Sequence, residues 1–283
     1  MKCLTENPYL CGCMTKAQEI IEYMESLQNE KQQEILMRFF KTAPGEYGYG
    51  DEFLGIKVPQ TRTVVRMAGD DIALEEVPLL LASGWHEVRL CGLLILVKQF
   101  GRLATKRLTE DEDAARGRDE LVRLYLKHAE RVNNWDLVDL SAPHILGHWL
   151  LLPGFFGGRA LELYTDEKRE LVDGLAASTN LWRQRMSMVC TWKTTQMGDP
   201  TWCLRYAETH LHHRHDLMQK AVGWMLREMG KRVSMELLRE FLRQHAHEMP
   251  RTMLRYAIEK MSMAERKDWM AKKSDESGLR NGA

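Results

Sequence analysis

The sequence contains no apolar run long enough to cross a membrane, since a transmembrane helix needs about 18 or more consecutive apolar residues. Its first residues, Met1 to Asn7, include a lysine and a glutamate and lack the apolar core of a signal peptide. Net charge is absent as well, because 40 Lys and Arg residues balance 40 Asp and Glu residues. We therefore expect a cytoplasmic protein without membrane contact, in which any charged partner meets a local patch of the surface.

Motifs of several common chemistries are also missing. The sequence has no glycine-rich phosphate loop, no nucleophile elbow and no helix-hairpin-helix signature. Only Cys11 and Cys13, among six scattered cysteines, stand close together, and no second pair completes a zinc pattern. Reduced thiols are therefore favoured over a disulfide framework. Four histidines between His210 and His215 lack zinc spacing too, and solvated side chains are the favoured interpretation, so we expect neither a cofactor nor a metal.

Alternating strands of convincing length are lacking, and the helical period takes their place. Apolar residues recur at three- and four-residue steps in most segments, for example in 20–27 and 253–258. Residues 178–180 form a capping-type break, and Asn133 or Asn134 offers a cap for a helix that starts at Trp135. We therefore predict an all-α fold.

The ends of the chain and one loop differ in composition from these helical segments. We expect a flexible N-terminus over 1–14, a single domain over 15–271 and a polar, disordered tail over 272–283. The loop 44–51 contains three glycines and two tyrosines and cannot hold a helix. A loop shaped for contact and a flexible connector between helices are equally compatible with it.

What the sequence does contain is a repeat. Five segments that each lie early in an apolar helix can be aligned, and they are 87–91, 137–141, 183–187, 218–222 and 253–257. The residues in the middle of these segments, here called the repeat column, are Arg89, Asp139, Arg185, Lys220 and Arg255. The last three are 35 residues apart, a period that indicates a helical solenoid. Because one helix pair cannot bury its apolar face alone, successive pairs should stack into a curved α-solenoid.

The repeat column predicts a basic groove along the concave side of that solenoid. A single cation early in a helix is better explained as a cap or a solvated side chain, but the series of five favours a groove. Residues 181–260 hold 14 Lys and Arg residues against 8 Asp and Glu residues, which makes this segment +6. We therefore predict an anion-binding surface suited to nucleic acid, with one acid, Asp139, among its cations.

Tryptophans accompany members of the repeat column. Trp135 and Asp139 are four residues apart, so they share one face of a helix. An indole beside a carboxylate lowers the local dielectric, and the carboxylate then acts more strongly on a developing cation. Trp224 shares a face with Lys220 in the same way, while Gly223 permits close approach of another backbone or a ligand. Trp182 likewise shares a face with Arg185, and burial of Trp182 in the core is at least as good an explanation as contact with a ligand. For Asp139 the plainer alternative is an acid that compensates the helix dipole.

Five short blocks of the sequence stand out together. They are Phe53-Leu54-Gly55-Ile56-Lys57-Val58-Pro59 with Arg62, His86-Glu87 with Arg89, Asn134-Trp135-Asp136 with Asp139, Trp182 with Arg185, and Lys220-Ala221 with Gly223-Trp224 and Leu226-Arg227-Glu228. In these blocks the chain resembles the HEAT-like-repeat DNA alkylation repair glycosylases, the AlkD-type enzymes. The resemblance runs from about residue 35 to residue 262 and is specific only when the blocks are taken together.

This resemblance implies an α-solenoid of HEAT-like repeats that works as a DNA N-glycosylase. Such an enzyme removes cationic N3- and N7-alkylated purines from double-stranded DNA, and the family does so without extruding the base. The catalytic tryptophan, aspartate and arginine of the family correspond to Trp135, Asp139 and Arg185. Asp139 would stabilise an oxocarbenium-like sugar, Trp135 would line it, and Arg185 would hold a phosphate.

The resemblance also implies a set of DNA contacts. A further DNA-facing tryptophan of the family corresponds to Trp224. The cations that would bind backbone phosphates without reading sequence are Arg89, Lys220, Arg227 and Arg255. A DNA-contacting tyrosine near the first helices has no clear match here, and Phe39 is the nearest candidate.

Two other functions remain open at this point. One is a non-catalytic HEAT-repeat protein that binds damaged or branched DNA, and the other is a solenoid that binds proteins. The presence of both Trp135 and Asp139 favours the enzyme over the DNA-binding protein. We expect a monomer with no obligate protein partner, and the sequence leaves open whether 3-methyladenine, 7-methylguanine or a bulkier adduct is preferred.

Overall fold

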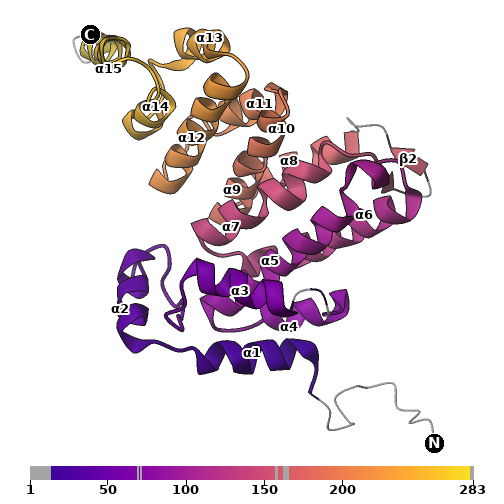
Figure 1. Cartoon of the computed structure of the whole chain (residues 1–283). Coiled ribbons are helices and arrows are strands. Elements are labelled where there is room, and N and C mark those ends of the chain that lie inside the picture. Colours follow the sequence, from indigo (N-terminus) through magenta and orange to yellow (C-terminus); the bar gives the residue numbers. More distant parts are fainter. Residues whose placement is uncertain (1–13, 69, 71, 157–158, 162–165, 281–283) are drawn as a thin grey trace, which may run out of the picture.

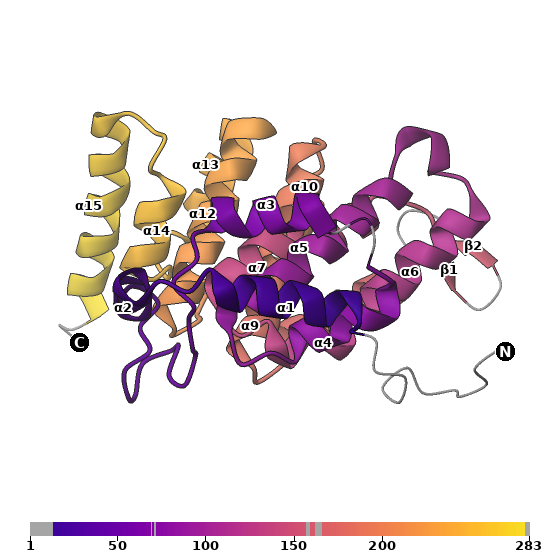
Figure 2. The same ribbon diagram turned by 60° about the horizontal axis from the view of Figure 1, so that its bottom comes forward.

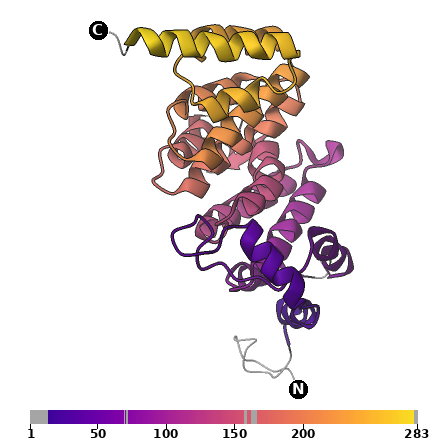
Figure 3. The ribbon, with the colours of Figure 1, turned by 90° about the vertical axis from the view of Figure 1, so that its left-hand side faces the viewer.

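The computed structural model describes residues 14–68, 70, 72–156, 159–161 and 166–280. Its helices follow one another along a curved path from α1 to α15 (Figures 1 and 3). The α-helices are α1 (Lys16–Ser26), α2 (Glu30–Phe39), α3 (Val58–Ala68), α4 (Val77–Leu81), α5 (His86–Leu103), α6 (Glu112–Lys127), α7 (Trp135–Ser141), α8 (Asp166–Ala176), α9 (Leu181–Val189), α10 (Thr191–Gln196), α11 (Thr201–Thr209), α12 (Asp216–Arg232), α13 (Met235–His245), α14 (Arg251–Ala257) and α15 (Met263–Arg280). The shorter elements are the 3-10 helices η2 (Leu74–Glu76), η3 (Lys106–Leu108) and η4 (Ala129–Arg131), the π-helix η5 (Pro143–Gly147), and the strands β1 (Gly154–Phe156) and β2 (Arg159–Leu161).

Five of these helices form a continuous stack, in which α5 contacts α7, α7 contacts α9, α9 contacts α12, and α12 contacts α14. Each of them carries one member of the repeat column. Arg89 is the fourth residue of α5, and the fifth residues of the other four helices are Asp139, Arg185, Lys220 and Arg255. The helices that the sequence aligns are therefore the ones that stack, and the predicted α-solenoid is confirmed.

The remaining helices cover this stack from outside. Helices α3 and α4 pack on α5, α8 packs on α9, and α11 and α13 pack on α12. The strands β1 and β2 lie beside α6, on the side of the molecule far from α15 (Figure 2). Helices α5, α9 and α12 of the stack are thus each covered by at least one partner helix, as a solenoid requires.

Asparagine caps fix where two of the stacked helices begin. The Asn134 side chain accepts a hydrogen bond from the Trp135 backbone N–H at 2.9 Å, and α7 starts there. Asn180 accepts from the N–H groups of Trp182 and Arg183 at 2.9 and 3.1 Å at the start of α9. Both caps are confirmed, and removal of such a cap costs about 1 kcal/mol. Local sequence therefore sets the starting points of the two helices that carry Asp139 and Arg185.

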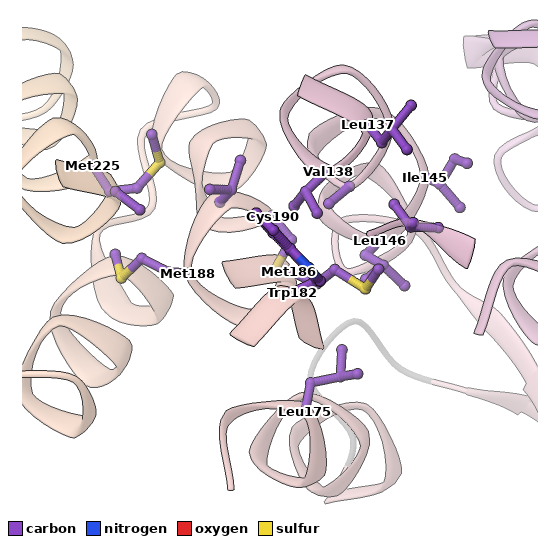
Figure 4. Packing of buried hydrophobic residues seen from close by; sticks show 14 of the residues in the cluster. Leu137, Val138, Ile145, Leu146, Leu175, Trp182, Met186, Met188, Cys190 and Met225 are labelled. Carbon is purple, nitrogen blue, oxygen red and sulfur yellow. The ribbon is translucent and has the colours of Figure 1, made fainter. Parts of the chain in front are cut away.

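The apolar faces of α7 and α9 meet in the core (Figure 4). Leu137 and Val138 on α7 and Met186 on α9 are fully buried there. Complete burial of one such side chain contributes roughly 1.5–3 kcal/mol relative to exposure. Because 137 and 138 point into the core, Trp135 and Asp139 are left half-buried at the edge of the same helix.

Gly223 explains how closely the last two stacked helices approach. A Cβ atom at this position would collide with the carbonyl oxygen of Met253 and with the side chain of Tyr256. The predicted close approach therefore involves the backbone of α14, and α12 and α14 share the most extensive helix contact described in this chain.

Two features depart from the sequence predictions. The strands β1 and β2 form an antiparallel pair, with Gly154 opposite Leu161, because three-residue strands are too short to show an alternating pattern. Helix α15 continues to Arg280, across most of the predicted disordered tail, since a helix that has already formed adds residues at little cost. Of the predicted flexible segment 1–14, residues 1–13 lie outside the described residues. No helix in the described ranges combines the length and the apolar character of a membrane span.

Candidate active site

A cavity of about 410 Å³ lies beside the N-terminal part of α7. Its walls come from α2, the segment 53–59, α5 and α7. The α7 residues that line it are Trp135, Asp136, Asp139 and Leu140. Elements that are far apart in the sequence therefore meet at Trp135 and Asp139.

Aromatic rings form one wall of this cavity. The Trp135 ring stacks on Phe40, with centroids 5.3 Å apart and planes 24° apart, and the Phe39 ring meets Trp135 edge-on at 5.9 Å. Phe40 in turn stacks on Phe53 at 5.1 Å. Offset-stacked and edge-on pairs are the favoured arrangements of aromatic rings. The wall is apolar and stiff, so a charge placed beside it is poorly screened.

Asp139 and Arg185 form a bidentate ion pair across two stacked helices. The Nε atom of Arg185 donates to Asp139 Oδ1 at 2.9 Å, and its Nη2 atom donates to Oδ2 at 2.8 Å. The third nitrogen, Nη1, donates to the carbonyl oxygen of Leu217. The planar guanidinium therefore fixes both carboxylate oxygens of Asp139 at once.

The Asp139 carboxyl is held in a partly desolvated place, where 15% of its side chain is exposed. Burial raises the pKa of this carboxyl above its usual value, and the charge and hydrogen bonds of Arg185 only partly offset that effect. The neighbouring Asp136 raises it further. A carboxylate with so little water around it interacts strongly with a cation that comes to lie beside it.

A second polar cluster lies deeper in the same wall. His86, the first residue of α5, is 1% exposed and uses both ring nitrogens. Its Nδ1 lies 2.7 Å from Asp51 Oδ2, and its Nε2 lies 2.9 Å from Asp136 Oδ2. Asp51 also pairs with the Arg89 guanidinium. This cluster, here called the His86 bridge, joins the end of the loop 44–51 to the start of α7.

Comparison with known families identifies the relatives of this chain. The model of a family described as "DNA alkylation repair enzyme" matches residues 20–261. The chain belongs to that family. Membership in the DNA alkylation repair enzyme family places the protein in DNA repair and indicates an enzyme.

Among solved structures, the chain is similar to one described as "Predicted DNA alkylation repair enzyme from Enterococcus faecalis". The TM-score is 0.58, the sequences are 12% identical, and the match covers 83% of this chain and 97% of that chain. At this identity the likeness concerns the fold alone. No curated protein matches the chain.

Two of the five sequence blocks that carry the family resemblance, 53–59 and the block with Glu87, are bonded to each other in the structure. The buried Glu87 carboxylate accepts hydrogen bonds from the backbone N–H groups of Leu54, Gly55 and Ile56 at 2.9, 2.9 and 3.0 Å. Gly55 has a φ of 84°, and a Cβ atom there would collide with the carbonyl oxygen of Asn29. Glu87 thus fixes the backbone between Phe53 and Ile56, and these three residues line the cavity beside α7.

Two arginines of the repeat column are placed differently from the prediction. Arg89 is 2% exposed, and its guanidinium contacts Asp51 and the carbonyl oxygens of Ser83 and Gly84. Its donors are directed into the protein, so the structure does not support the predicted contact between Arg89 and DNA. Arg185 likewise has a 5% exposed side chain, and in this structure it is bonded to Asp139 and fixes that carboxylate. Its contact with a phosphate stays a prediction.

The cations near the C-terminal end of the column are more accessible. Arg255 is exposed and forms no ion pair with any described residue. Lys220 has a 38% exposed side chain and pairs with Asp216 at 2.6 Å. Arg227 has a 17% exposed side chain and pairs with Glu259, so it is the least accessible of the three. Phosphate contacts by this group remain a prediction, as does the predicted basic groove.

The predicted aromatic contacts divide in a similar way. Phe39 is 60% exposed at the end of α2 and lines the cavity beside Trp135, so it stands where a ligand could touch it. Trp224 is half-buried and packs on the edge of the core. The structure thus brings Phe39, Trp135, Asp139 and Arg185 together.

Tyr47 is a residue of this site that the sequence did not single out. Its ring meets Trp182 edge-on at 6.1 Å, and it stands close enough to Trp135 and Lys220 for both to affect it. Burial raises the pKa of the Tyr47 hydroxyl, while a side-chain hydrogen bond with Trp135 lowers it. The aromatic and glycine-rich composition of the loop 44–51 was the sequence signal for this residue. The loop places Tyr47 against Trp135 and Trp182.

The histidine cluster is structural in two of its members. His210 is 3% exposed and its Nε2 lies 2.9 Å from Ser187 Oγ, so it is not solvated as predicted. His213 Nε2 lies 2.9 Å from Gln184 Oε1. No group of three or more His, Cys, Asp or Glu residues in the described part of the chain is arranged to hold a metal ion.

Proposed function

We propose that this protein is a DNA glycosylase that removes cationic N3- and N7-alkylated purines from double-stranded DNA by hydrolysis of the N-glycosidic bond. The observation that carries the proposal is the Asp139 carboxylate, fixed by Arg185 at the edge of an aromatic-walled cavity. A fixed negative charge in a poorly hydrated place suits a reaction that develops positive charge. Family membership supports the same class of reaction.

The chemistry needs little more than that charge and a water molecule. Alkylation at N3 or N7 makes the purine cationic and therefore a good leaving group. When the bond between C1′ and the purine nitrogen breaks, its electron pair goes to the purine, and the positive charge passes to the deoxyribose. Asp139 stabilises this oxocarbenium-like sugar. Water then adds to C1′ and loses a proton, which leaves a free neutral base and a sugar hydroxyl.

The accessible cations of the repeat column bind the DNA backbone. Lys220 and Arg255 bind backbone phosphates, and Trp135 and Trp224 lie against the sugar. We take the lesion to remain in the base stack, so that only the sugar approaches Asp139. The accessibility of Arg255 and Lys220 supports this orientation.

The experiment that tests the function is release of 7-methylguanine from methylated duplex DNA by Asp139→Asn. The amide keeps the shape and one acceptor oxygen for Arg185 but removes the negative charge. Loss of one preorganised electrostatic contact lowers the rate by about 10²- to 10³-fold. Affinity for DNA should stay within about threefold of the wild type, because Asp139 repels phosphate rather than binding it.

Asp173→Asn is the matched control. Asp173 makes the same bidentate contact with an arginine, Arg205, at 3.1 and 2.6 Å, but on α8, away from the cavity. It should release base at the wild-type rate. Undiminished release by Asp139→Asn would sink the mechanism. A wild-type protein that binds damaged DNA tightly and releases no base would favour the non-catalytic DNA-binding protein.

A further inference from the structure

The His86 bridge joins the loop 44–51 to α7 through a buried charged side chain. A longer hydrogen bond, from Asn134 Nδ2 at the start of α7 to Asp51 Oδ2 at 3.4 Å, runs beside it. Asp51 ends the loop, and Asp136 is the second residue of α7, next to Trp135. Within the loop, Tyr47 stands against Trp135. The bridge therefore connects two segments that both contribute to the wall beside Asp139.

Each ring nitrogen of His86 faces an oxygen of an ionised carboxylate, and such an oxygen can only accept a hydrogen bond. A neutral imidazole donates through one nitrogen only, whereas a protonated ring donates through both. Burial acts to lower the pKa of His86, but the Asp136 and Asp51 carboxylates outweigh it and raise that pKa to about 9. At neutral pH the ring is therefore a cation with two acceptors.

The two carboxylates do not depend on His86 equally. Asp51 has a second cationic partner in Arg89. Asp136 is 5% exposed, and among the described residues its Oδ1 atom has no hydrogen-bond partner, so His86 is its sole charge compensation there. Without the imidazolium, a buried carboxylate one turn before Asp139 would be left uncompensated, which is strongly unfavourable.

We propose that His86 is a positioning residue of the reaction: as a doubly hydrogen-bonded cation it holds the loop 44–51 against α7 and keeps the Asp136 charge from disturbing Asp139. This inference rests on the glycosylase function proposed above. His86 touches neither the sugar nor the base, and it acts through Asp136, Trp135 and Tyr47.

Loss of the proton from His86 should therefore switch off base release at alkaline pH. The charged or titratable groups around the bridge are Asp51, Asp136, Asp139, Glu87, Arg89, Arg131 and, beside Trp135, Tyr47. Carboxylic acids as a class titrate far below pH 9 and guanidinium groups far above it, and the pKa of Tyr47 is raised above its usual 10. His86 is the group of this set that changes charge as the pH rises towards 9.

The test is single-turnover release of 7-methylguanine from a duplex by the full chain, measured between pH 6 and about 9.5. The wild-type rate should fall as the pH approaches 9. His86→Gln should lose up to about 100-fold at pH 7, the loss that a misplacement of about 1 Å in the reacting geometry can cause, with the DNA concentration for half-saturation little changed. Its rate should then be independent of pH across the alkaline range.

A double-mutant cycle with Asp136→Asn separates positioning from general damage. If the uncompensated Asp136 charge causes the loss, Asp136→Asn should restore part of the rate in the His86→Gln background, and the two effects should not add. Additive effects would overturn the proposal. His210→Gln is the control for loss of a buried histidine, and it should keep the alkaline fall in rate.

NMR titration of the His86 ring in the wild-type protein gives a second measurement that needs no variant to fold. The ring should lose its proton at the pH where the rate falls, and a mismatch between the two would refute the proposal. If the wild type is active and His86→Gln releases base at the wild-type rate, the positioning role is refuted and the glycosylase function stands. A wild type that releases no base at any pH removes the glycosylase function and this inference together.

Discussion

Arg89 and Arg255 occupy equivalent places at the two ends of the repeat column but meet opposite surroundings. Arg89 in α5 is buried, and Asp51 and two backbone carbonyls take up its guanidinium. Arg255 in α14 is exposed and has no ion-pair partner among the described residues. A position in the repeat thus fixes which helix face a cation occupies, whereas the loop that covers the cation decides whether it pairs inside the protein or stays accessible to a ligand.

The members between these two ends show the same transition. Arg185 is buried and bonded to Asp139, and Lys220 is half-exposed and paired with a neighbour on its own helix. Along the stack, cations therefore change from parts of the site to groups that a ligand can reach. The loop 44–51 covers only the first part, through Asp51 and Tyr47.

Substitution of the buried arginine should have the largest effect on stability. Arg89→Met removes one of the two cations that pair with Asp51 and leaves the other, His86, so it should cost about 3 kcal/mol, the lower end of the range for breaking a buried pair on one side. Arg255→Met should change the free energy of unfolding by no more than about 0.5 kcal/mol, because it leaves nothing buried unpaired. Unfolding in guanidinium chloride measures both. Equal losses at the two positions would mean that the buried network does not separate the two ends.

Local chemistry made the elements of this fold predictable. The caps at Asn134 and Asn180 and the apolar period between them depend on residues a few positions apart, so α7 and α9 follow from the sequence. The 35-residue spacing likewise predicts which helices stack, because each repeat must cover its neighbour. The close approach at Gly223 belongs to the same class, since a glycine inside a helix removes the side chain that would hold two backbones apart.

The site features that the sequence did not predict are contacts, chiefly ion pairs, between residues that are far apart in the chain. Arg89 meets Asp51 across 38 residues, and Arg185 meets Asp139 across 46. Nothing in the spacing of charges says that a glycine-rich loop returns to bury one arginine or that the acid of the column pairs with the next cation. Tyr47 was missed for the same reason, as its contacts arise only once the loop is folded back.

Two buried histidines should give opposite pH dependences of stability. The pKa of His86 is raised to about 9, so its stabilising contribution is complete below pH 6.5 and is lost as the pH rises towards 9. Burial, helped by His213, lowers the pKa of His210 to about 4, so the unfolded chain binds the proton first and stability falls as the pH drops from 6.5 towards 4.

Thermal unfolding between pH 4 and 9.5 measures these dependences, with His86→Gln and His210→Gln to separate them. His86→Gln should lose the fall in stability at alkaline pH and keep the fall at acid pH, and His210→Gln should do the reverse. When His86 becomes neutral, Asp51 keeps its arginine, so the alkaline loss of stability should come mainly from the uncompensated Asp136. A protein whose stability is flat from pH 7 to 9.5 would contradict a charged His86 and would weaken the contrast between the two halves of the stack.

Removal of single accessible cations should have the smallest effect and should appear in DNA binding rather than in stability. Every cation that binds a phosphate adds about one to the slope of log affinity against log salt, so its removal lowers that slope by about one. Arg255→Ala should therefore weaken binding to duplex DNA several-fold at low salt. Lys220→Ala should cost less, because Lys220 must leave its 2.6 Å ion pair with Asp216 before it can meet a phosphate.

Arg243→Ala is the matched control for this pair of variants. Arg243 is 50% exposed on α13, outside the stack, and pairs with Glu236 and Glu240. Its removal should leave the salt slope as it is in the wild type. If Arg255→Ala and Arg243→Ala behaved alike, the repeat column would not mark the DNA-facing side. If Lys220→Ala had the larger effect of the two column variants, the DNA would lie closer to Asp139 than the exposure of Arg255 suggests, since Lys220 is the column member adjoining Arg185.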